Sequence, residues 1–262
     1  MSRLTWLGHS TVVIEIDGTR LLTDPVLRRR VLHLRRSAAV EPSAVGALDG
    51  ILVSHVHYDH LDLPSLARLD RSLPVVVPSG AGSLVRRAGF ERVVEVAEDV
   101  ELVVGRVRVR ATHALHDGSR RPFGLNAPAL GYVVEGSSSV YFAGDTDLFG
   151  GMTEIGPVDA AVLPVSGWGP RLPPGHLDPA SAAEALRLLR PKLAVPVHFG
   201  TFRTPFGPMP TDSPAQAFAR AAVERAPSVE VRILPLGGSC EIGCATSPVL
   251  DDASACRRRF PR

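Results

Sequence analysis

Residues 54–62 read Ser-His-Val-His-Tyr-Asp-His-Leu-Asp, so three histidines and a carboxylate fall within six positions. The apolar residues 50–53 before this stretch predict a short buried strand, and residues 63–69 after it predict the start of a helix. Asp62 is the expected N-cap of that helix, with Pro64 in its first turn. The cluster is therefore expected on a strand-to-helix loop, which two rigid elements hold in place.

The spacing within this loop favours metal binding. His55 and His57 are two residues apart, so both rings project to one side of an extended chain. Asp59 and His60 follow where the chain turns, so their side chains can face a second point, away from the one that His55 and His57 share. Imidazole and carboxylate together suit zinc, and also iron or manganese. A solvated polar loop is the alternative, but the concentration of histidine beside an aspartate favours a metal site.

The pattern His-x-His-x-Asp-His after an apolar strand resembles the metallo-β-lactamase superfamily. The resemblance implies an α/β fold, an αββα sandwich of two mixed β-sheets flanked by helices, with metals at one edge. It implies two divalent ions, with zinc favoured and manganese or iron as alternatives. Leu-Gly-His-Ser-Thr at residues 7–11 is similar to the opening of the branch that includes N-acyl phosphatidylethanolamine phospholipase D and L-ascorbate-6-phosphate lactonase.

The next ligand that the resemblance implies is a histidine after the expected hairpin of residues 101–111. His113 and His116 are both candidates. In the phospholipase-like branch the ligand precedes an arginine by four residues, and His116 with Arg120 matches that spacing. His116 is therefore the preferred ligand, and His113 is expected to support the site or to be a plain strand residue.

The last two ligands follow later strands. Asp145 lies in Gly-Asp-Thr after the expected strand 139–143 and would bridge the two metals, because each carboxylate oxygen can bind one cation. His198 ends the expected strand 193–197. The implied ligand set is His55, His57 and His116 for one ion, Asp59, His60 and His198 for the other, and Asp145 between them.

Three residues are expected to support the metal loop from behind. Asp24 follows the expected strand 20–23, where the superfamily places an aspartate that hydrogen-bonds to the loop. His9 is a further candidate, and a buried structural histidine is an equal alternative there. His113 completes this group.

Residues expected to act on the substrate come from the same resemblance. Asp59 and His176 are the candidate catalytic residues, and His176 lies in a Gly-His-Leu-Asp-Pro segment. His176 would bind a substrate oxyanion or pass a proton to the leaving group, unless it is only a loop residue beside the helix cap Asp178. The candidate substrate contacts are His176, Arg120, Trp168 and Arg171.

Length and composition are those of one globular domain. The 262 residues are 45% apolar with a formal net charge of +2, so no general attraction to nucleic acid is expected. We expect a hydrolase domain over residues 1–245 and a tail over 246–262 that is a candidate for disorder. No signal segment or long apolar run is found, which predicts a cytoplasmic protein without stable membrane insertion. The expected partner is a small, anionic substrate, and a homo-oligomer stays open.

Two further features have plain interpretations. The arginine-rich run of residues 28–36 has two interpretations: a flap that captures an anionic group, or a solvated basic loop. The solvated loop is the favoured one, because runs of charge are usually exposed to solvent. Cys240, Cys244 and Cys256 are expected to be ordinary reduced thiols, because no partner pair completes a zinc site.

Together these features predict a dinuclear metal-dependent hydrolase. The resemblance implies that a hydroxide bridging the metals attacks a phosphodiester or a lactone or ester of a small molecule. Two alternatives belong to other classes: a metal-binding sensor without turnover, and a nucleic-acid-directed phosphodiesterase that uses residues 28–36. The complete ligand set argues against the first, and the near-neutral charge argues against the second.

Overall fold

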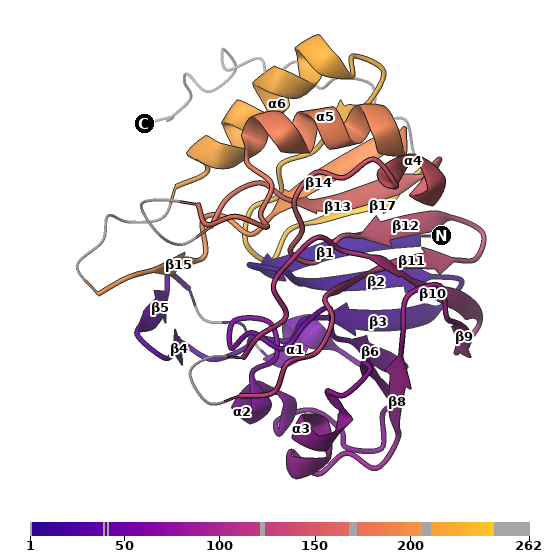
Figure 1. The fold of residues 1–262 in the computed structure, drawn as a ribbon, viewed down its shortest axis with the longest axis vertical. Coiled ribbons are helices and arrows are strands. Elements are labelled where there is room, and N and C mark those ends of the chain that lie inside the picture. The colour runs from indigo at the N-terminus through magenta and orange to yellow at the C-terminus, as the bar shows by residue number, and fades with distance from the viewer. Residues whose placement is uncertain are drawn as a thin grey trace, which may run out of the picture.

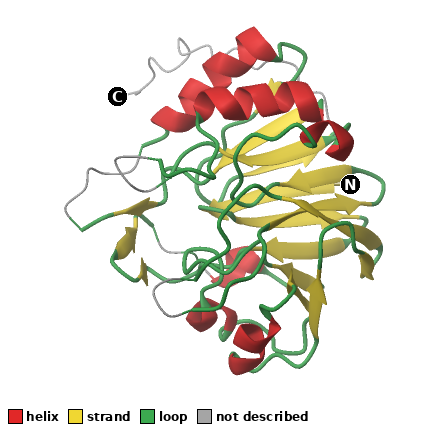
Figure 2. Cartoon of the chain, viewed as in Figure 1, coloured by secondary structure: helices red, strands yellow, loops and turns green. Residues whose placement is uncertain are grey.

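Two seven-stranded β-sheets form the centre of the molecule, with helices on both outer sides (Figures 1 and 2). The computed structural model describes residues 2–38, 40, 42–120, 124–167, 172–205 and 211–243. The arrangement is the αββα sandwich that the sequence predicts. Trp168, Arg171, Cys244, Cys256 and the tail 246–262 lie outside the described residues, so the predictions for them and for the domain boundary stay predictions.

The first sheet carries the N-terminal half of the chain and one late strand. Its strands are antiparallel at one side, from β17 to β3, and parallel from β3 to β8. In sheet order they are β17 (Ser239–Ile242), β1 (Ser2–Gly8), β2 (Thr11–Ile16), β3 (Thr19–Thr23), β6 (Gly50–Leu52), β7 (Val75–Pro78) and β8 (Val93–Val96).

The second sheet is also mixed. Its strands are antiparallel from β9 to β12 and parallel from β12 to β16. In sheet order they are β16 (Glu230–Val231), β14 (Leu193–Val197), β13 (Ala160–Pro164), β12 (Ser139–Phe142), β11 (Leu130–Glu135), β10 (Val107–His113) and β9 (Glu101–Val104).

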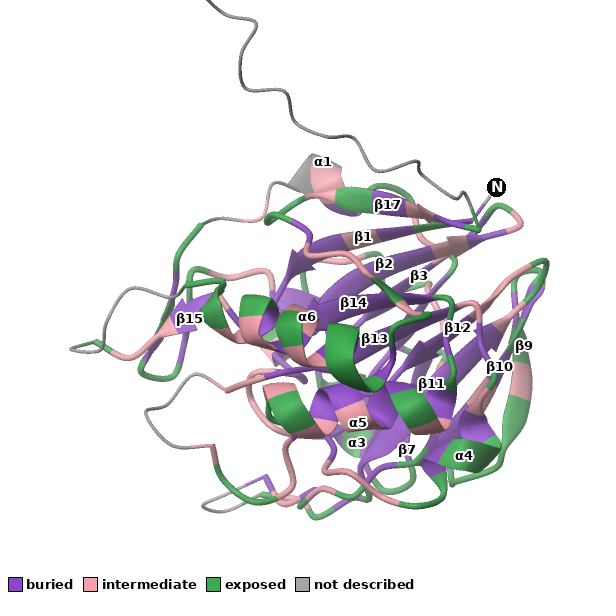
Figure 3. Cartoon of the chain, turned by 90° about the horizontal axis from the view of Figure 1, so that it is seen from above, coloured by how far each residue is buried: buried purple, intermediate pink, exposed green. Residues whose placement is uncertain are grey.

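The central strands β2, β7, β13 and β14 are buried on both faces, which explains their nearly continuous apolar runs. In β2, Val12 and Ile14 face the main core, whereas Val13 between them packs on the other side with α1 (Pro42–Val45). Figure 3 shows the buried strands enclosed by helices whose exposed residues face outward. The other helices are α2 (Leu63–Leu66), α3 (Gly82–Arg87), α4 (Met152–Ile155), α5 (Pro179–Leu189) and α6 (Ser213–Arg225).

Both predicted helix caps are confirmed. The Asp62 side chain accepts a hydrogen bond from the Ser65 amide at the start of α2, and Asp178 makes a reciprocal capping box with Ser181 at the start of α5. α2 is shorter than expected and ends at Leu66, so the capped turn mainly fixes the exit of the preceding loop.

Two parts of the fold differ from expectation. The segment 229–234, expected to be the closing strand, forms only the two-residue β16, and β17 closes the first sheet by pairing with β1. The connector 25–49 contains a hairpin of β4 (Arg30–Val31) and β5 (Leu34–Arg36), which β15 (Phe202–Arg203) extends into a small third sheet beside the sandwich (Figure 1).

Two smaller observations complete the comparison. Cys240 is a buried free thiol. None of the helices in the described part of the chain has the length and apolar character needed to cross a membrane.

Candidate metal centre

The predicted ligands meet at the edge of the sandwich where strands of both sheets end. The first sheet supplies the metal loop, residues 53–62, which directly follows β6. The second sheet supplies Asp145 after β12 and His198 after β14, and His116 follows β10. Carboxyl ends of parallel strands share one edge of a sheet, so residues far apart in sequence come together here.

One ligand group consists of three histidines. Nε2 of His55 lies 3.0 Å from Nδ1 of His57, and Nε2 of His116 lies 3.2 Å from the same Nδ1. All three nitrogens could bind one ion. The structure therefore brings together the three residues predicted for the first metal, and it does so with His116 and not His113.

The second group lies deeper and contains one residue more than predicted. Nitrogen and oxygen atoms of His9, Asp59, His60 and His198 lie within 4.8 Å of one another. Nε2 of His9 is 3.0 Å from Oδ2 of Asp59, and Nε2 of His60 is 3.9 Å from that oxygen. His9 thus contacts the ligand group directly and orients its carboxylate.

Asp145 lies between the two groups, as expected for a bridging ligand. Its Oδ2 is 3.1 Å from Nε2 of His60, 3.2 Å from Nε2 of His198 and 3.9 Å from Nε2 of His55. Nε2 of His176 approaches the same oxygen to 3.4 Å. One carboxylate oxygen therefore faces histidines of both groups, and the predicted His176 is beside it.

The outer nitrogens of four histidines are each held by an oxygen, which fixes the rings. The Nδ1 partners are Ser54 Oγ for His55 (2.9 Å), Asp24 Oδ2 for His60 (2.7 Å), the Gly175 carbonyl for His116 (2.8 Å) and the Ser166 carbonyl for His198 (2.6 Å). Because Asp24 already accepts the Ser54 hydroxyl proton, Ser54 Oγ accepts from His55. Each of these oxygens accepts the Nδ1 proton of its ring, which leaves Nε2 facing the cluster.

These residues fit a bound cation. Nε2 of His60, Nε2 of His198 and Oδ1 of Asp145 are buried and have no hydrogen-bond partner among the described residues. Buried polar atoms normally form hydrogen bonds, so three buried polar atoms at one point without a hydrogen bond need another partner. Histidine nitrogens and a carboxylate are the donor set that zinc, iron and manganese accept.

The protonation states of most of the histidines also suit metal binding. Burial lowers the pKa of His9 to about 3 and the pKa of His116 to about 4, and it holds the pKa of His55 well below its ordinary value. Burial opposes ionisation of Asp145, but the neighbouring His198 and His60 outweigh it and lower the pKa of Asp145. These three histidines are therefore neutral near pH 7, and Asp145 is ionised.

His60 and His176 differ from the other histidines. Burial opposes the charge on His60, yet Asp145 and Asp24 raise its pKa well above the ordinary value. Burial likewise opposes the charge on His176, and the hydrogen bond to Asp145 outweighs it and raises the pKa. His176 is held from the other side by the Pro173 carbonyl, 3.1 Å from its Nδ1.

Asp24 supports the metal loop as predicted. It is fully buried, and its carboxylate accepts hydrogen bonds from the Ser54 amide (2.7 Å), the Ser54 hydroxyl (2.6 Å) and Nδ1 of His60 (2.7 Å). Its φ of 35° lies in the left-handed region, as do those of His9 (54°) and His198 (62°). Backbone strain at three residues of one cluster is typical of a functional site.

Of the two alternatives that the sequence left open for His113, the structure favours the plain strand residue. This histidine ends β10 and is exposed, and its Nδ1 lies 3.1 Å from Glu98. It lines a separate cavity of about 300 Å³ with Phe149. The strand ends before the chain turns toward the metals, so His113 stays outside while His116 reaches the cluster.

Arg120 also has a different role from the predicted substrate contact. It is only 7% exposed, and its guanidinium donates to the carbonyls of Val56 and Leu61, the latter at 3.0 Å. Its Cζ lies 3.8 Å from the centre of the Tyr58 ring. Arg120 therefore ties together two carbonyls of the metal loop.

Replacing Arg120 by Lys should destabilise the protein, because one ammonium cannot reproduce the planar contacts to both carbonyls and the Tyr58 ring. We expect a loss of about 2 kcal/mol in unfolding free energy, measured by urea denaturation, with weaker metal binding. Unchanged stability combined with a raised KM only for anionic substrates would instead support the original assignment.

Two arginines of the run 28–36 are also structural. Arg28 forms a two-point ion pair with Asp62, at 2.8 and 2.5 Å. Arg36 is buried and donates to the carbonyls of Val26 and Leu7, and burial lowers its pKa to about 10. Neither sequence interpretation of this run anticipated that it helps to hold the connector against the metal loop.

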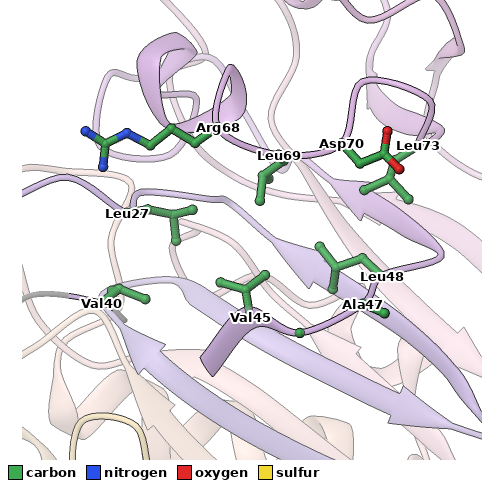
Figure 4. Close-up of a pocket in the computed structure, with 10 residues that line it drawn as sticks. Leu27, Val40, Val45, Ala47, Leu48, Arg68, Leu69, Asp70 and Leu73 are labelled. Carbon is green, nitrogen blue, oxygen red and sulfur yellow. The ribbon is translucent and has the colours of Figure 1, made fainter. Parts of the chain in front are cut away.

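Two cavities differ in whether candidate ligands line them. One of about 450 Å³ is lined by His57 and Asp59 of the ligand groups and by the β4–β5 hairpin. The other, of about 360 Å³, lies between residues 45–48 and 68–73, and its walls are mainly leucine and valine (Figure 4). No candidate metal ligand lines the second cavity, so the chemistry belongs to the first.

Comparison with known proteins places this geometry in a family. The beta-lactamase superfamily domain matches residues 19–199. The chain belongs to this superfamily. Within it, a UPF0173 metal-dependent hydrolase of Methanopyrus kandleri is 33% identical over 247 residues, covering 91% of this chain and 99% of the relative. This chain is therefore a UPF0173 member of the beta-lactamase superfamily.

Other relatives add length and fold information. An uncharacterised protein of Mycobacterium tuberculosis is 32% identical over 238 residues, which are 84% of this chain but only 63% of that longer protein. A metallo hydrolase of Ignicoccus hospitalis, 24% identical, superposes with a TM-score of 0.69 over 91% of this chain and 97% of its own. The UPF0173 chain therefore shares the superfamily fold beyond the matched domain.

Proposed function

We propose that this protein is a dinuclear metal-dependent hydrolase of a small ester, lactone or phosphodiester. The observation that carries the proposal is the position of Asp145, whose one oxygen faces His60, His198 and His55. The buried Nε2 atoms of His60 and His198 form no hydrogen bond among the described residues. His55, His57 and His116 would hold one ion, Asp59, His60 and His198 the other, and Asp145 both.

Divalent ions in such a site polarise the scissile group and supply a hydroxide nucleophile near neutral pH. The chain's own residues add positioning and proton transfer. The His9 ring holds the Asp59 carboxylate, which orients the attacking water. His176, 12% exposed and fixed between Asp145 and the Pro173 carbonyl, donates a proton to the leaving group.

The proposal also covers the alternative function, the cellular location and the partner. A non-catalytic metal sensor is disfavoured because all seven predicted ligands are present and lie together. A cytoplasmic location and a small-molecule partner are parts of the proposal, and the relatives named metal-dependent hydrolases support its reaction class.

Metal content is the first test. We expect about two divalent ions per chain by elemental analysis after purification or after reconstitution with zinc, manganese or iron. The loaded protein should hydrolyse at least one of bis(p-nitrophenyl) phosphate and a set of small lactones, and chelation should abolish turnover. A chain that takes up no metal under any reconstitution would exclude the proposal, and one that binds metal without turnover would favour the sensor.

A further inference from the structure

The cavity beside the metal centre has one wall from the β4–β5 hairpin, residues 31–34, and one from His57, Tyr58 and Asp59. Its volume of about 450 Å³ is large enough for part of a small molecule. Because His57 and Asp59 belong to the two ligand groups, whatever occupies the cavity lies next to the metals.

The hairpin presents apolar side chains to this cavity and charged ones to solvent. Val31 pairs with Leu34 and Arg30 pairs with Arg35 across the two strands, so the two pairs lie on opposite faces. Val31 and Leu34 are buried in a small cluster with Phe202, against which Tyr58 packs. The apolar wall is therefore held in place by its own packing.

Leu32 at the tip of the hairpin is unusual in two respects. Its exposed fraction is 60%, although it lines the cavity, and its φ of 49° lies in the left-handed region. A leucine in that conformation costs on the order of 1–3 kcal/mol, and glycine or asparagine normally occupies such turn positions. A solvent-exposed leucine held there beside the candidate metal centre is free to contact a bound molecule.

Apart from the proposed ions, the described side chains that line the cavity carry no fixed positive charge for an anionic group. Arg28, Arg36 and Arg120 are engaged with Asp62 and with backbone carbonyls, and no arginine or lysine is among the described residues that line the cavity. His33 and Asp117 line it instead. A carboxylate therefore faces the cavity, and no arginine or lysine among the described lining residues offers a countercharge to an anionic substituent, contrary to the anionic substrate that the sequence suggested.

We propose that this cavity binds the apolar, uncharged alkyl or acyl group of a lactone or carboxylic ester. The inference rests on the proposed function and selects among its substrates. In the reaction, the water oxygen forms a new bond to the carbonyl carbon and the carbon–oxygen bond to the leaving group breaks. The alcohol oxygen takes one proton, which gives an acid and an alcohol. Leu32 sets the preference for the length of the apolar group.

The test compares γ-lactones with side chains from methyl to hexyl, using the zinc-loaded full chain. Each methylene that enters the cavity should raise kcat/KM about fourfold until the cavity is full, because burying one CH₂ is worth about 0.8 kcal/mol. Leu32→Asn tolerates the left-handed backbone and removes the apolar contact, so it should flatten this dependence on side-chain length. Val223→Asn, which alters a 72% exposed valine of α6, is the matched control.

Binding gives a second measurement that does not depend on turnover. A hexyl-substituted cyclopentanone, which resembles the lactone but cannot be hydrolysed, should bind the wild-type chain and the Val223→Asn variant equally in calorimetry. Leu32→Asn should weaken its binding by about tenfold, as expected when roughly 50 Å² of buried apolar contact is lost.

The outcomes separate this inference from the proposed function. Rates independent of side-chain length, or equal binding of the ketone by Leu32→Asn and wild type, would overturn the apolar cavity. Turnover of bis(p-nitrophenyl) phosphate but of no lactone would overturn it and leave the hydrolase intact. A chain without bound metal or any turnover would remove the proposed function, and the substrate preference with it.

Discussion

Replacing Asp145 by Asn is expected to lower kcat/KM on the best substrate by on the order of 10³-fold or more. The charge stabilisation that metal ions supply is worth several kcal/mol, and each 1.36 kcal/mol corresponds to tenfold in rate. Asparagine keeps the shape of the side chain but removes the negative charge that faces His55, His60 and His198. At least one of the proposed ions should therefore be lost, which elemental analysis measures on the same sample.

A matched control separates this effect from a general loss of charge. Asp159 accepts hydrogen bonds from Ser139 and forms an ion pair with Lys192. It directly precedes β13, belongs to neither ligand group, and lies at the end of the strand away from the metal cluster. Asp159→Asn should keep full metal content and turnover. If Asp145→Asn also keeps both, Asp145 does not bridge metals and the dinuclear proposal must be abandoned.

Replacing Asp24 by Asn should have the largest effect on folding stability. The Asp24 carboxylate accepts three hydrogen bonds in a fully buried position, and an amide would place its own N–H groups against at least one of those donors. We expect a loss of about 3 kcal/mol in unfolding free energy, which corresponds to a fall in Tm of roughly 10 °C for a chain of this size.

Metal affinity should fall in the same variant, because Asp24 orients His60. Loss of such a supporting carboxylate typically costs 10- to 100-fold in metal binding. Competition with a coloured chelator measures this directly, and Asp159→Asn again serves as the control, with a stability change of no more than about 1 kcal/mol. Equal behaviour of the two variants would show that the Asp24 hydrogen bonds do not position the loop.

The local features of the fold could be predicted from sequence because their signals are local. The caps at Asp62 and Asp178 depend on residues three positions away. The spacing of its histidines and the apolar strand before it identify the metal loop in the sequence. The superfamily resemblance then ordered Asp145 and His198 correctly, because each follows a clear buried strand.

Residues whose role depends on distant contacts could not be assigned in this way. The preference for His116 over His113 came from the resemblance alone, and the contact that holds His116 at the cluster is the Gly175 carbonyl, 59 positions away. Arg120 resembles an anion-binding residue in sequence, but burial against two loop carbonyls gives it another role. The closing strand β17 pairs with a strand at the other end of the chain, and short-range periodicity carries no signal for such a pairing.

The ligand groups draw on both sheets, and this has a consequence for how the protein acquires its ions. Asp59 and His60 come from the first sheet, whereas Asp145 and His198 come from the second, so neither half of the chain can complete the deeper group alone. A ligand that binds only the joined halves stabilises their junction more as its concentration rises. Uptake of the proposed ions would therefore follow the joining of the two sheets, and metal scarcity in a cell would deplete the protein itself and not only its activity.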